Sequence, residues 1–114
     1  MIRIKRVYEI PAKDDGFRVL VDRLWPRGVS KERAALDQWL KNIAPSQELR
    51  LWFGHRPEKF AEFTARYIDE LHQNPAVEDM RQLHEQHKQI TLVYAAEDTK
   101  VNHALVLQRY LTGR

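Results

Sequence analysis

The chain has 114 residues, a length typical of one domain that buries enough surface for a single core. It contains no cysteine, which excludes disulfides, thiolate metal sites and a cysteine nucleophile, and suits a reducing compartment. The net charge is +3, but residues 1–56 carry twelve basic and seven acidic side chains, whereas residues 57–114 carry seven and nine. The basic first half favours an anionic small molecule or a nucleic acid as partner, although so small an excess is also typical of an ordinary solubilising surface.

The first two expected elements are strands. Residues 2–7 alternate apolar and charged side chains, the period of a strand with one solvated face, and they lack the apolar core of a signal peptide. No apolar run approaches the roughly 20 residues of a membrane span, so we expect a cytoplasmic protein with no membrane partner. Residues 17–21 are nearly all apolar, which is typical of a central strand. The intervening turn at residues 11–16 fits either a hairpin or a tight crossover.

Helices follow in the middle of the chain. Ser30 is expected to cap a short helix ending at Ala35, and the apolar side chains of residues 36–43 recur at helical spacing, which predicts a further helix before Pro45. Ser46 is expected to cap another helix that ends at Gly54.

The second half alternates helices with one strand. A first-turn proline opens the longest expected helix, over residues 57–74, and a further helix runs to about residue 87. Residues 90–95 form the third clear strand. Asp98 or Thr99 is expected to cap the last helix, which ends before Gly113.

Strands separated by helices predict the fold class: one α/β domain over residues 1–114, with a small, mainly parallel sheet of three or four strands covered by helices on both faces. Right-handed crossovers bring the carboxyl ends of strands 17–21 and 90–95 to one edge of the sheet. The loop at 22–27 and the loop at 97–103 should therefore face each other.

The loop at 22–27 carries the strongest functional signal, because an apolar strand runs directly into polar and aromatic residues. Arg23 and Arg27 are four residues apart and present guanidinium forks suited to a phosphate or a carboxylate. Asp22 and Trp25 lie beside them, and Trp25 serves equally well as pocket wall or as a ligand contact. The pattern predicts an anion site at the carboxyl ends of the strands.

Two further segments add candidates to this site. Asn102 and His103 interrupt an apolar helix, so His103, oriented by Asp98 or Asn102, is the first acid–base candidate, although a helix-capping role alone would also explain Asp98. The helix start at Ser46 offers free backbone N–H groups to an anion, with Arg50 one turn inside, and an N-cap role alone would also account for this serine. His55 is the second acid–base candidate.

No metal and no cofactor is assigned from the sequence. His84 and His87 have helical spacing but lie in a charged segment typical of a solvated face. His55, Asp98 and His103 would form a better three-ligand set only if the fold brought them together. The chain lacks a G-x-G-x-x-G fingerprint, a Walker loop and a G-x-S-x-G elbow, which excludes the dinucleotide, P-loop and α/β-hydrolase interpretations.

Three blocks of the sequence, at residues 21–29, 44–55 and 92–104, resemble the YeaO-like family of small bacterial proteins, a domain of unknown function. The resemblance covers essentially the whole chain. It implies a compact α/β domain, usually alone in its chain, and brings no established activity. The polar residues characteristic of the family correspond here to Asp22, Arg23, Arg27, Ser46, Arg50, His55, Asp98, Asn102 and His103.

Three functional hypotheses follow from the sequence. The first is a binding or catalytic domain whose arginines hold a phosphorylated small molecule, a nucleotide or a nucleic-acid end. The second is a non-enzymatic nucleic-acid-binding module that uses the basic first half and loses affinity steeply with salt. The third is a structural or interaction domain whose polar loops only fix the strand ends. Whether the protein is an enzyme, and in which oligomeric state it acts, is left open.

Overall fold

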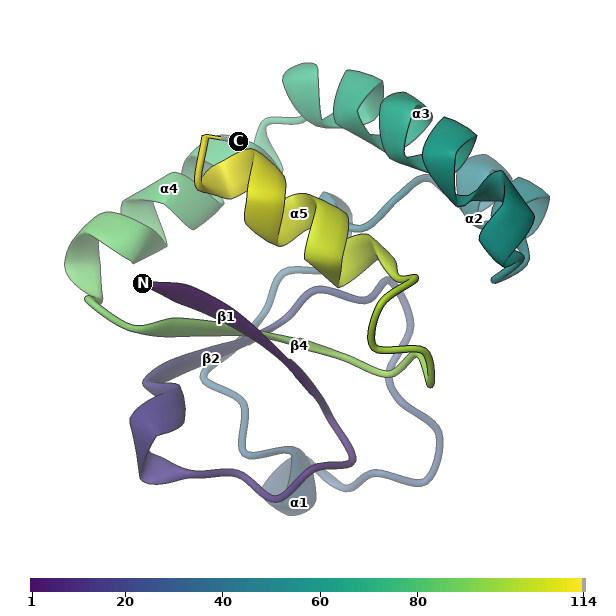
Figure 1. The fold of residues 1–114 in the computed structure, drawn as a ribbon. Helices are drawn as coiled ribbons and strands as arrows, with labels where there is room; N and C mark the ends of the chain where they lie inside the picture. The colour runs from purple at the N-terminus through teal and green to yellow at the C-terminus, as the bar shows by residue number, and fades with distance from the viewer. Residues whose placement is uncertain (114) are drawn as a thin grey trace.

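A computed structural model describes residues 1–113 and contains a four-stranded, wholly parallel sheet in the order β1-β4-β2-β3 (Figure 1). The strands are β1 (Ile2–Arg6), β2 (Phe17–Leu20), β3 (Gln38–Trp39) and β4 (Ile90–Tyr94). β4 is central and buried along all five residues, as its continuous apolar run predicts. The predicted α/β class, with a small parallel sheet, is confirmed.

The strand order shows whether residues 11–16 form a hairpin or a crossover. β4 lies between β1 and β2 and is parallel to both, so the first connection is a crossover and not a hairpin. The crossover contains a short 3-10 helix, η1 (Lys13–Asp15). The carboxyl ends of β2 and β4 lie at the same edge, as predicted, because Leu20 pairs with Val93 in register.

One face of the sheet carries the larger core. It is covered by α2 (Gln47–Phe53), α3 (Phe60–His72), α4 (Ala76–Gln86) and α5 (His103–Leu111), with the 3-10 turn η3 (Pro57–Lys59) leading into α3 (Figure 1). Val19, Leu92 and Tyr94 of the sheet belong to this core, together with Phe63 and Tyr67 of α3. The predicted helices at residues 46–54 and 57–74, and the further helix ending at about residue 87, are confirmed, with Ser46 as N-cap and Gly54 as C-cap of α2.

The opposite face has a much smaller core, and helices cover it too. α1 (Lys31–Ala34), capped by Ser30 as predicted, lies beneath the sheet together with η1 (Figure 1). Leu20 and Val93 alternate with their strand neighbours to reach this side, where Val7, Val29 and Ala34 complete the cluster. Within residues 1–113, no helix is both long and apolar enough to cross a membrane.

The helix predicted over residues 36–43 is wrong. The segment forms β3 and a 3-10 turn, η2 (Lys41–Ile43). The backbone of this segment pairs with the edge of β2: Asp37 N donates to Arg18 O and Leu40 N donates to Leu20 O, both at 2.9 Å. The Asp37 carboxylate also accepts from Arg18 N at 2.8 Å, so tertiary hydrogen bonds override the helical spacing of the apolar residues.

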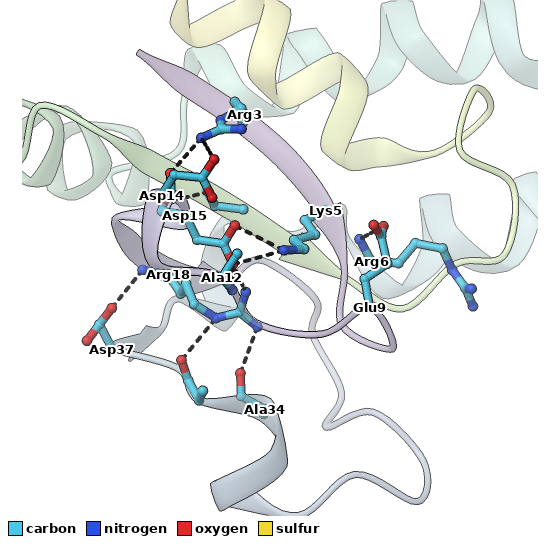
Figure 2. A network of polar contacts seen from close by, with 12 residues as sticks. Arg3, Lys5, Arg6, Glu9, Ala12, Asp14, Asp15, Arg18, Ala34 and Asp37 are labelled. Atoms are coloured by element: carbon cyan, nitrogen blue, oxygen red, sulfur yellow. Dashed lines mark hydrogen bonds and ion pairs between the residues drawn. The ribbon is translucent and has the colours of Figure 1, made fainter.

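A buried ionic network fixes η1 to the underside of the sheet (Figure 2). The Asp15 carboxylate accepts from Arg18 Nη1 at 2.6 Å, from Lys5 Nζ at 3.1 Å and from the Ala12 backbone N–H at 3.0 Å. Arg18 also donates to the carbonyls of Ala34 and Ala35, which ties α1 to the same cluster. Burial raises the pKa of Asp15, but these hydrogen bonds and cations outweigh it and hold the pKa below its ordinary value of 3.8.

Candidate functional site

A cavity of about 730 Å³ opens at the carboxyl edge of the sheet, between the loops that follow β2 and β4 and the end of α2. The two loops face each other, as the parallel topology predicts. Of the ten candidate residues from the sequence, the cavity is lined by nine: Asp22, Arg23, Trp25, Arg27, Arg50, His55, Asp98, Asn102 and His103. Ser46 is the exception.

An aspartate–histidine pair forms part of the cavity lining. Asp22 Oδ2 accepts from the Ala95 backbone N–H at 3.0 Å, and Asp22 Oδ1 lies 3.2 Å from His103 Nε2. The same Nε2 lies 3.0 Å from the Val21 carbonyl oxygen. Because a carbonyl only accepts, this contact assigns the hydrogen to Nε2. The prediction that Asp98 or Asn102 orients His103 is therefore wrong: the hydrogen bond of its ring goes to the Val21 carbonyl, and the Asp22 carboxylate lies beside that bond.

Asp98 and Asn102 shape the loop that carries His103. α5 begins at His103, and its N-cap is Asn102, whose Oδ1 accepts from Leu105 N at 2.8 Å. The predicted cap at Asp98 or Thr99 is wrong, because Asp98 Oδ1 closes a turn by accepting from Lys100 N and Val101 N. Asn102 Nδ2 donates to the Asp98 carbonyl at 2.8 Å, which joins the turn to the helix start.

The three cavity arginines differ in what they bind. Arg23 donates through Nε and Nη2 to the carbonyls of Ala44 and Pro45, at 3.1–3.2 Å. Arg27 and Arg50 are exposed, and within residues 1–113 their guanidinium groups have no ion pair or hydrogen-bond partner. By contrast, Arg3, Arg18, Arg56 and Arg66 all pair with carboxylates elsewhere on the molecule.

The acidic groups of the cavity are equal in number to its arginines. Asp22, Glu97 and Asp98 line the same hollow as Arg23, Arg27 and Arg50. Asp22 and Asp98 are already engaged by backbone N–H groups, which stabilise their charge in place. Among the described residues, none of these three carboxylates lies within ion-pair distance of Arg27 or Arg50.

Aromatic side chains complete the wall. Trp25 donates through Nε1 to the Val29 carbonyl at 2.6 Å and contacts Trp39 edge to face, with ring centroids 5.5 Å apart. Phe53 and Phe63 also line the cavity, and their rings stack with centroids 4.2 Å apart. The sequence missed both phenylalanines as lining residues, because their helical spacing predicts only a core role.

Tyr67 supports the site from the core. Its ring meets the His103 ring edge to face at 6.2 Å, and its hydroxyl donates to the Ile43 carbonyl at 2.7 Å. Burial, reinforced by the carboxylates of Glu70 and Asp22, raises the pKa of the Tyr67 hydroxyl well above its ordinary value. Tyr67 therefore stays a neutral hydrogen-bond donor that holds the loop before α2.

Ser46 lies away from the cavity and is occupied by a carboxylate of the protein itself. Its hydroxyl donates to Glu70 Oε2 at 2.6 Å and accepts from Leu49 N, and its backbone N–H donates to Glu70 Oε1 at 2.9 Å. The N–H and hydroxyl of Ser46 itself are thus directed toward Glu70. Ser46 is an N-cap with an acidic partner from α3.

No metal centre is found in the part of the chain that the structure describes, since no three histidine, aspartate or glutamate side chains gather as ligands would. His55, Asp98 and His103 share the cavity without forming such a group. His84 instead lies 3.5 Å from the N-terminal amine, and His87 stacks on Phe17 at 4.0 Å.

The fold and the cavity together define a class: a small α/β protein with a polar hollow at the carboxyl edge of a parallel sheet. Over residues 1–114 the chain matches the family described as the inactive DUF488-N3 subclade. It is 47% identical over 111 residues to the uncharacterised protein YeaO of Escherichia coli, covering 96% of each chain. It is 45% identical over 113 residues to an uncharacterised protein of Mycobacterium tuberculosis, covering 99% of this chain and 95% of that one.

The chain therefore belongs to the inactive DUF488-N3 subclade, the YeaO-like family of small bacterial proteins that the sequence motifs predict. No solved structure matches it.

Proposed function

We propose that the cavity binds a phosphate-bearing small molecule, such as a nucleotide or a nucleic-acid end, through Arg27 and Arg50. The observation that carries this proposal is that these two guanidinium groups line one cavity and have no acidic partner within residues 1–113. A guanidinium fork binds phosphate oxygens with two parallel hydrogen bonds. Arg23 adds a third positive charge, which is fixed in place by the Ala44 and Pro45 carbonyls.

Binding, and not turnover, is the role we propose for this site. The matching family is described as an inactive subclade. Among the described residues that line the cavity there is no serine, threonine, cysteine or lysine, the side chains that most often attack phosphoryl or acyl groups. His103 would be the acid–base group for any proton transfer. We place the protein in the cytoplasm, a setting that suits its lack of cysteine.

The alternative of a nucleic-acid-binding module has less support. Three basic side chains of the first half are already engaged by carboxylates of the protein, because Lys5 and Arg18 bind Asp15, and Arg3 pairs with Asp14. Phosphate-backbone binding depends on many free cations spread over a surface. The cationic groups left without acidic partners include Arg27 and Arg50, which converge on one hollow.

Calorimetric titration with adenosine 5′-monophosphate tests the proposal. We expect Arg27→Ala and Arg50→Ala each to weaken binding by about tenfold or more, since each removes a charge-assisted hydrogen bond worth about 1.5–3 kcal/mol. Arg81→Ala is the matched control, because Arg81 lies on α4 and its guanidinium contacts only the Tyr110 ring in the described structure.

Two results would reject this site. One is wild-type affinity in both cavity variants. The other is an equal loss in all three variants with a steep dependence on salt, which would favour a nucleic-acid-binding surface instead.

A further inference from the structure

Within residues 1–113, one ring nitrogen of His103 is hydrogen-bonded and the other is not. Its Nε2 is engaged, since it donates to the Val21 carbonyl at 3.0 Å and lies 3.2 Å from Asp22 Oδ1. Asp22 is itself fixed by the hydrogen bond from the Ala95 N–H to Oδ2. The hydrogen of the neutral imidazole therefore resides on Nε2, and Nδ1 carries the lone pair.

The Nδ1 atom of His103 has no partner among the described residues and is not enclosed. Within residues 1–113 it has no hydrogen-bond partner, and the one enclosed side-chain nitrogen or oxygen without a partner is Asp22 Oδ1. Nδ1 is therefore reached by solvent. The side chain of His103 is 17% exposed and lines the cavity, so the cavity is where a ligand would meet this nitrogen.

The size of the cavity argues against a bare anion. A hollow of about 730 Å³ falls in the range that holds a drug-sized organic molecule, of about 300–1,000 Å³. Inorganic phosphate would leave the apolar wall formed by Trp25, Phe53 and Phe63 without a partner. The ligand that fits joins an anionic group to an organic body.

We propose that the cavity selects phosphate esters whose organic part carries a hydroxyl group, and that His103 Nδ1 accepts a hydrogen bond from this hydroxyl. A sugar phosphate or a nucleoside monophosphate has this chemistry. In this arrangement the Val21 carbonyl fixes the hydrogen on Nε2, the nearby Asp22 carboxylate favours it there electrostatically, and Nδ1 is left as the acceptor. The inference rests on the proposed function, in which Arg27 and Arg50 bind the phosphate.

The test compares two ligands and two substitutions. Adenosine 5′-monophosphate and its 2′,3′-dideoxy analogue differ only in the ribose hydroxyls, and we expect the wild-type protein to bind the first about tenfold more tightly. His103→Gln keeps an amide donor near the Nε2 position and removes the acceptor at Nδ1, so it should bind both nucleotides equally. His103→Asn places an amide oxygen near the Nδ1 position and should preserve the preference.

The outcomes separate this inference from the proposed function. If the wild-type protein binds both nucleotides equally while Arg27→Ala weakens both, the hydroxyl selection is wrong and the phosphate site stands. If neither nucleotide binds, both proposals fail. A preference that survives in His103→Gln also overturns the inference.

The tautomer of His103 can be measured without any ligand. Long-range ¹H–¹⁵N correlation spectra of the histidine rings should show the Nε2–H tautomer for neutral His103. The opposite tautomer would remove the acceptor from the cavity and overturn the inference without reference to any ligand.

Discussion

Replacing Asp15 with asparagine should lower the free energy of unfolding by about 3–5 kcal/mol, because it leaves one buried and one partly buried cation without their counter-charge. The side chains of Asp15 and Arg18 are each 5% exposed, and that of Lys5 is 17% exposed. This loss is a large fraction of the roughly 5–15 kcal/mol that stabilises a typical domain. Urea unfolding followed by circular dichroism measures it directly.

The neighbouring aspartate provides the control. Asp14 pairs with Arg3, but the two side chains are 76% and 45% exposed, so Asp14→Asn should change stability by no more than about 0.5 kcal/mol. Equal effects at the two positions would contradict the view that the buried network fixes η1 beneath the sheet.

The same carboxylate should make stability depend on pH. Folding lowers the pKa of Asp15, which means that the folded protein stabilises the ionised carboxylate more than the unfolded chain does. This contribution is complete above the ordinary aspartate pKa of 3.8 and is lost as the pH falls through the lower folded-state value. The stability gap between wild type and Asp15→Asn should therefore narrow in acid, and a constant gap would contradict the assignment.

Gly16→Ala should be destabilising by about 3 kcal/mol or more, and the protein should accumulate poorly in soluble form. Gly16 has φ of +67°, and an added Cβ would lie 2.3 Å from the Gln89 carbonyl oxygen and 2.7 Å from Gln89 Cβ. That carbonyl accepts from Phe17 N at 2.9 Å, the hydrogen bond that starts the pairing of β2 with the β4 side of the sheet. The clash therefore falls where the strand begins.

Gly28→Ala separates backbone strain from steric clash. Gly28 has φ of +76°, similar to that of Gly16, but an added Cβ would have no atom within 4 Å. The strain alone should cost about 1 kcal/mol. If thermal unfolding shows the same loss of stability for both alanine variants, steric clash with Gln89 is not the reason that position 16 requires glycine.

The sequence predicts elements well where local chemistry and tertiary packing agree. The run at residues 90–95 has no charge and can only be buried, and Ser30 and Ser46 cap helices as their positions predict. The helix prediction for residues 36–43 fails because the apolar spacing there is compatible both with a helix and with a short strand followed by a turn. The hydrogen-bonding edge of β2 that decides between them is invisible in a local window.

The composition of the site could be predicted, but its internal contacts could not. Parallel topology brings Asp22 and His103 to one edge of the sheet. Which carboxylate lies beside the histidine depends on the paths of the loops that follow the two strands, whereas local spacing predicts Asp98. Glu70 likewise reaches Ser46 from 24 residues away, a contact that only the packing of α3 on α2 creates.

The claim that Arg27 and Arg50 bind a phosphate ester is tested most directly by the Nε–Hε signals of arginine side chains in ¹⁵N-resolved NMR spectra. On titration with adenosine 5′-monophosphate, the signals of Arg27 and Arg50 should shift together and saturate, while those of Arg81 and Arg109 stay in place. Unchanged signals at Arg27 and Arg50, or shifts spread evenly over all exposed arginines, would contradict a phosphate site in this cavity.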